Sequence, residues 1–150
     1  MHRLLPPPAA LFLAGLLAWL LARAFPAWQV VLPGQQGVAL ALAVAGSSLM
    51  LAAALSLLAA RTTLNPLHPE RASTLIAVGA FALSRNPIYL GDALLLCAWL
   101  VWLGQPLGLL ALAGFVLWLD RAQIPAEERA LAQRFGADWQ AYRARVRRWL

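Results

Sequence analysis

Long apolar stretches separated by short polar segments run through most of the chain. They extend roughly from Ala9 to Ala22, Gly37 to Ala60, Pro87 to Leu103 and Leu107 to Leu119. A helix of about 20 apolar residues crosses the ~30 Å hydrocarbon layer, so the second stretch spans it with some tilt and the last two are short. Gly104-Gln105-Pro106 predicts a tight turn that joins the last two stretches as a helical hairpin. The pattern predicts an all-α integral membrane protein with about four transmembrane helices.

The tail from Ala126 to Leu150 has a different pattern. Its apolar residues recur at steps of three and four, which places them on one helical face: Leu131, Phe135, Trp139, Tyr142, Val146 and Trp149. Most of the arginines of the tail lie elsewhere. This spacing predicts an amphipathic helix that lies on the membrane surface or covers the cytoplasmic mouth of the protein, with a break expected at Gly136.

Composition and charge add a membrane location and an orientation. The 150 residues are 62% hydrophobic and 12% charged, which is too apolar for a soluble domain and is consistent with one domain over 1–150. Ten of the twelve arginines lie between Arg61 and Arg85 or after Asp120. The positive-inside rule then predicts cytoplasmic termini, and we expect a bacterial inner membrane. The first stretch also has features of a cleaved signal peptide, and that alternative stays open.

Several classes of site are not expected. Cys97 is the single cysteine and the two histidines are far apart, so we expect no intrachain disulfide and no metal. No nucleic-acid or phosphate-loop motif occurs, and the arginines beside apolar stretches favour membrane lipids as partners rather than nucleic acid.

Two polar clusters border the hairpin and carry the candidate chemistry. One runs from Ser84 to Gly91, and the other is the pair Glu127 and Glu128. Charged and amide side chains beside hydrocarbon usually have a function, so the two clusters indicate one site at a membrane face.

Each cluster also has a purely structural interpretation. Asn86 and Pro87 are typical of a helix start, where Asn86 caps and the positive helix end, with Arg85, holds a carboxylate or phosphate. Alternatively, Asn86 only caps and Arg85 binds lipid phosphate. The two glutamates either are solvated acids in a first helical turn or face a cationic ligand. Asp92, about one turn into an apolar stretch, either pairs with Arg85 or with a Ser or Thr of the preceding loop, or has a functional role.

An ordered set of short motifs runs from Thr62 to Trp149. It comprises Thr63-Leu64-Asn65-Pro66, Gly79-Ala80-Phe81, the Arg85–Gly91 stretch, Glu127-Glu128, Leu131, Phe135-Gly136, Trp139, Tyr142 and Val146-Arg147-Arg148-Trp149. This set resembles the isoprenylcysteine carboxyl methyltransferase family and the related phospholipid methyltransferases. The resemblance implies an integral membrane enzyme that binds S-adenosylmethionine in a cytoplasmic pocket over the last hairpin, without a Rossmann fold.

The resemblance also implies roles for particular residues. Those expected to bind the cofactor are Ser73, Thr74, Leu75, Ile76, Phe81, Asn86, Pro87, Ile88, Tyr89 and Glu127. Those expected on the substrate side are Arg85, Gln123 and Glu128. No catalytic residue is assigned, because methyl transfer from a sulfonium needs mainly alignment.

The chain departs from the prenylcysteine enzymes at two site positions. Asn86 stands where they have His, and Gln123 stands where they carry an Arg associated with the substrate's carboxylate. We therefore expect methyl transfer to a different lipophilic acceptor. Two alternatives remain: an NADPH-dependent membrane reductase of the steroid-reductase type, and a non-enzymatic membrane protein whose basic tail binds anionic lipid.

Overall fold

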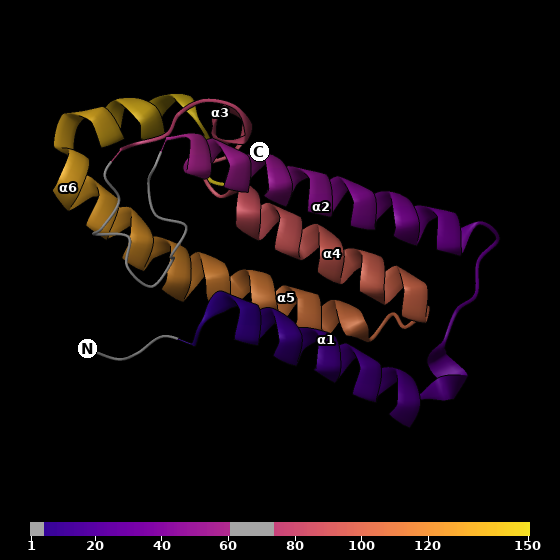
Figure 1. Ribbon diagram of the computed structural model, residues 1–150. Coiled ribbons are helices and arrows are strands. Elements are labelled where there is room, and N and C mark those ends of the chain that lie inside the picture. Colours follow the sequence, from indigo (N-terminus) through magenta and orange to yellow (C-terminus); the bar gives the residue numbers. More distant parts are fainter. Residues whose placement is uncertain (1–4, 61–73) are drawn as a thin grey trace.

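The computed structural model describes residues 5–60 and 74–150, and within these ranges the chain forms helices and no strand (Figure 1). The elements are α1 (Pro7–Ala24), a 3₁₀ turn η1 (Pro26–Trp28), α2 (Gln35–Ala59), α3 (Ala80–Leu83), α4 (Pro87–Leu103), α5 (Gly108–Trp118), a π-helical turn η3 (Leu119–Gln123) and α6 (Ile124–Arg145). The predicted all-α class is confirmed. Ser73 and the Thr63–Pro66 motif lie outside the described residues.

Four apolar helices match the four predicted stretches. In the described part of the chain, α1, α2 and the continuous helix that starts at Gly108 are long and apolar enough to cross a membrane. Helix α4 is shorter and has the predicted bounds. Proline suits the first position of α4, because the N–H group that Pro87 lacks would have no partner within the helix. Gly104 ends the helix in a left-handed conformation with φ 61°.

The apolar helices alternate in direction, so the starts of α1 and α4 and the ends of α2 and α5 meet at the end of the molecule that α6 covers (Figure 1). We call this the polar end. Helix α2 packs mainly on α4, and α1 packs on α5 and α4. The predicted turn between α4 and α5 is confirmed at the opposite end, where the N–H of Val30 donates to the carbonyl oxygen of Gly104 at 2.7 Å.

Small residues allow these helices to approach closely. A Cβ on Gly91 of α4 would lie 2.9 Å from the carbonyl oxygen of Gly46 of α2, and a Cβ on Gly46 would lie 2.8 Å from the carbonyl oxygen of Gly91. Many large apolar side chains of α1 and α2, such as Phe12 and Leu40, are exposed instead. This arrangement is typical of helices in lipid, where close backbone packing replaces the hydrophobic effect as the main attraction between helices.

The predicted tail helix differs from the structure at both ends. Helix α6 begins at Ile124 and continues directly from α5 through η3, and the predicted break at Gly136 is confirmed (φ 48°, ψ −114°). The expectation that one helical face continues to Trp149 was wrong, because the helix ends at Arg145. The segment after it is extended and pairs with the other polar cluster, since the N–H of Arg85 donates to the carbonyl oxygen of Arg147 at 2.9 Å.

Candidate functional site

At the polar end, Arg85 and Glu128 form the contact that joins the two polar clusters. Arg85 Nη2 donates to Glu128 Oε1 at 2.9 Å, and the exposed fractions of the two side chains are only 8% and 12%. The guanidinium lies 5.7 Å from the ring centre of Trp139 and also donates to the carbonyl oxygen of Arg143 at 3.3 Å. Burial lowers the pKa of Arg85, and the charge of Glu128 opposes that shift.

Arg148 gives Glu128 a second cationic partner. Its Nη2 donates to Glu128 Oε2 at 2.7 Å, and its Nη1 donates to Asp120 Oδ1 at 2.8 Å. The hydrogen bond to Glu128 raises the pKa of Arg148. Glu128 is therefore not a solvated acid of a first helical turn, because both of its oxygens bind guanidinium groups.

The neighbouring acid, Glu127, has neutral partners instead. The hydroxyl of Tyr89 and Nε2 of Gln123 (2.6 Å) both donate to Glu127 Oε1. Among the described residues no ion pair reaches this carboxylate. Gln123 is 2% exposed, and its Oε1 has no hydrogen-bond partner in the described part of the chain.

Asn86 connects the start of α4 to the C-terminal segment. Its Nδ2 donates to the carbonyl oxygen of Arg148 at 3.0 Å, and Ser84 Oγ donates to the same oxygen at 3.1 Å. Asn86 occupies the predicted N-cap position, but its side chain makes no capping hydrogen bond. The predicted helix start at Asn86 and Pro87 is confirmed, but the side-chain capping bond is absent, and the amide of Asn86 binds a carbonyl group from far along the chain instead.

The remaining predicted cofactor residues precede Ser84 in the chain or lie at the start of α4. Phe81 is tied to α6, since Tyr142 Oη donates to its carbonyl oxygen at 2.8 Å. Pro87 is buried and Ile88 is half-buried at the start of α4. Thr74 is exposed, whereas Leu75 is half-buried and Ile76 is buried.

The sequence pattern of the family described as phospholipid methyltransferase matches residues 35–138, which is more than half of the chain. The chain belongs to this family. A protein of Haemophilus influenzae (strain ATCC 51907 / DSM 11121 / KW20 / Rd), described as uncharacterized, is 41% identical over 63 residues, 42% of this chain and 100% of that protein. No solved structure matches.

Two residues that complete the polar network, Tyr142 and Arg148, lie after the end of the phospholipid methyltransferase match. Arg148 binds Glu128 and Asp120, and Tyr142 binds the backbone at Phe81. Neither residue is among the site residues expected from the sequence, and Ser84 was marked only as the first residue of the first polar cluster. Tyr142 and Arg148 belong to the ordered motif set, but the set did not indicate which side chains they contact.

Proposed function

We propose that this member of the phospholipid methyltransferase family transfers a methyl group from S-adenosylmethionine to a lipophilic acceptor dissolved in the membrane. The observation that carries the proposal is Glu127, a half-buried acid that Tyr89 and Gln123 hold and that no cation reaches among the described residues. Charges in such a setting are normally paired, so a cationic ligand would supply the missing charge. The family match supports a membrane methyltransferase in general.

The residues present fit the cofactor at both of its charged ends. Glu127 suits its cationic groups, whereas the start of α4, which no side chain caps, offers N–H groups and a positive helix end to its carboxylate. In our proposal, the rest of the cofactor is bound by the other residues assigned to it: Ser73, Thr74, Leu75, Ile76, Phe81, Asn86, Pro87, Ile88 and Tyr89. When bound, S-adenosylmethionine supplies a methyl group on a good leaving group. The protein then has to align the acceptor with the methyl donor, and positioning of this kind can remove a large part of the activation barrier.

The substrate side is assigned to Arg85, Gln123 and Glu128. The Nη2 of Arg85 is held by Glu128 and the Nε2 of Gln123 is used by Glu127. The buried Nε of Arg85 has no partner among the described residues, but the paired arrangement with Nη2 that binds a carboxylate most strongly is already partly used. This supports an acceptor other than a prenylcysteine carboxylate. The family match gives no support to the reductase alternative.

Calorimetric titration of the purified full chain in detergent tests this proposal. S-adenosylmethionine should bind and NADPH should not. Glu127→Gln keeps the shape of the side chain but removes its charge, and should weaken S-adenosylmethionine binding by about 1.5–3 kcal/mol. Asp138→Asn is the matched control, because Asp138 is an exposed acid on the same helix. Tight NADPH binding, or equal affinity in the Glu127→Gln variant, would refute the assignment.

A further inference from the structure

Asp92 is a buried acid that the network at the polar end does not use. It is 6% exposed, and no hydrogen bond or ion pair reaches it from the residues that the structure describes. Of the structural partners left open for Asp92, Arg85 binds Glu128 instead, and most of the preceding loop with its Ser and Thr residues lies outside the described residues. An ionisable residue inside an apolar helix is costly and normally faces a partner or a cavity. The structure therefore shows no partner for the Asp92 carboxyl group among the described residues.

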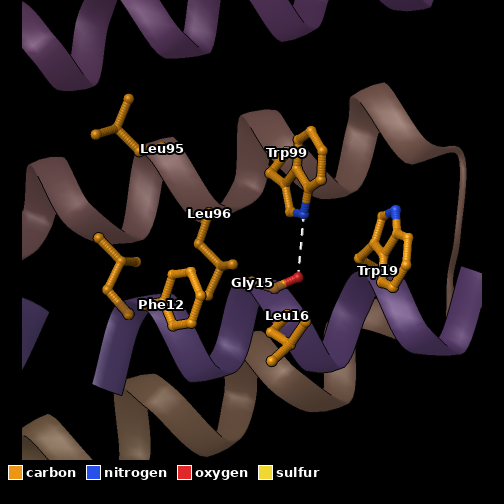
Figure 2. Close-up of a pocket in the computed structure, with 8 residues that line it drawn as sticks. Phe12, Gly15, Leu16, Trp19, Leu95, Leu96 and Trp99 are labelled. Carbon is orange, nitrogen blue, oxygen red and sulfur yellow. Dashed lines mark hydrogen bonds between the residues drawn. The ribbon is translucent and has the colours of Figure 1, made fainter. Parts of the chain in front are cut away.

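An apolar groove lies between α1 and α4, and its lining on α4 begins at Leu95, about one helical turn after Asp92. It has a volume of about 420 Å³ and is lined by Leu11, Phe12, Gly15, Leu16, Trp19, Leu95, Leu96 and Trp99. Figure 2 shows Leu96 of α4 pointing toward Phe12 of α1, and the indole N–H of Trp99 donating to the carbonyl oxygen of Gly15 at 3.1 Å. Phe12 and Trp19 are exposed, so the groove opens on the lipid-facing side of the helices. Its volume lies in the range of small-molecule sites.

The groove and Asp92 share one face of α4. Leu95, Leu96 and Trp99 follow Asp92 at three, four and seven residues, the spacing of a single helical stripe. Leu96 also packs in the same buried cluster as Tyr89, which lies one turn before Asp92 and binds Glu127. Along α4, Asp92 therefore lies between the groove residues Leu95, Leu96 and Trp99 and the candidate methyl-transfer site at Tyr89.

We propose that the groove holds the apolar chain of the methyl acceptor and that Asp92 accepts a hydrogen bond from its head group. This proposal rests on the proposed function and narrows the substrate class to amphiphiles whose heads carry N–H or O–H groups. A carboxylate head would meet the charge of Asp92 without a described cation to balance it, and like charges in a low dielectric repel strongly. A neutral or cationic donor would supply Asp92 with the partner it lacks. The acceptor's nucleophilic atom would then lie one helical turn from Tyr89.

The test uses two photoreactive probes with the same dodecyl chain, one with a primary amine head and one with a carboxylate head. They are crosslinked to the purified full chain in nanodiscs without any methyl donor, and the labelled peptides are mapped by mass spectrometry. We expect the amine probe to label peptides of α1 and α4 about tenfold more than the carboxylate probe, as loss of a hydrogen bond to a charged group predicts. Asp92→Asn should abolish this preference, and Asp92→Glu should keep most of it.

A pair of tryptophan variants tests the groove itself. Leu16→Trp fills the groove and should reduce labelling by the amine probe about tenfold, as the loss of a buried apolar contact predicts. Leu13→Trp is the control, because Leu13 is an exposed residue of the same helix outside the groove lining. Equal labelling by both probes, an unchanged preference in Asp92→Asn, or equal effects of the two tryptophans would overturn the inference. Binding of S-adenosylmethionine, measured separately in each variant, distinguishes that failure from a failure of the proposed function.

Discussion

The contact between Glu128 and its two arginines gives the sharpest stability prediction. Glu128→Gln removes the only carboxylate that the structure places against Arg85 among the described residues, while Arg85 stays buried with 8% of its side chain exposed. Removing one partner of a buried pair costs about 3–5 kcal/mol, because an uncompensated charge remains inside the protein. The ring of Trp139 and the carbonyl oxygen of Arg143 still contact Arg85, so we expect a loss near the lower end, about 3 kcal/mol.

Arg148→Gln should cost less, even though it breaks two ion pairs. The side chain of Arg148 is 28% exposed, so water can replace part of the hydrogen bonding that Asp120 and Glu128 lose. Glu128 would also keep its ion pair with Arg85. We expect about 1 kcal/mol. A double variant, Arg85→Leu with Glu128→Leu, should be more stable than Glu128→Gln alone, because it removes both charges together.

These differences are measurable as changes in the free energy of unfolding in detergent, followed by circular dichroism during denaturant titration. Asp138→Asn, an exposed acid on α6, serves as the control and should stay within about 0.5 kcal/mol of the parent. If the free energy of unfolding of Glu128→Gln equals or exceeds that of Arg148→Gln, then the Glu128 carboxylate does not compensate the buried charge of Arg85. The argument from burial would then be refuted.

Three further predictions concern packing, orientation and the acceptor. Gly91→Ala should destabilise the chain by about 1–3 kcal/mol, since its Cβ would meet α2, whereas Gly114→Ala, with open space around it, should not; thermal unfolding compares them. In a background without the native cysteine, Val31→Cys should react with an impermeant maleimide added outside intact cells and Arg145→Cys only after permeabilisation; the reverse would invert the predicted topology. Farnesylcysteine should be a poor substrate in a radiolabelled methyl-transfer assay, and Gln123→Arg should improve it; fast turnover by the parent protein would contradict this expectation.

Much of the fold follows from local properties of the sequence. The length of each apolar stretch sets how far a helix can extend in hydrocarbon, which is why the four helices lie close to their predicted bounds. The limits of α4 were predictable because Pro87 suits the first turn and Gly104 adopts the positive φ that ends the helix. Gly136 breaks α6 for the same kind of reason, since its φ of 48° is one that glycine adopts readily.

The partners of the polar side chains depended on contacts between distant segments. The hairpin predicted that the two polar clusters meet, but not which side chains pair, because Arg85 and Glu128 are 43 positions apart and Asn86 binds a carbonyl group 62 positions away. The same approach of the C-terminal segment explains why α6 ends at Arg145 although its apolar spacing continues.

Asp92 shows the same division between sequence and tertiary structure. Its position one turn into an apolar stretch was enough to mark it as unusual. That Arg85 is already occupied by Glu128, and that α1 lies across a groove from the helical face that carries Asp92, depended on how the helices pack. A charged side chain binds the nearest available partner in space, and only the packed helices determine which partner that is.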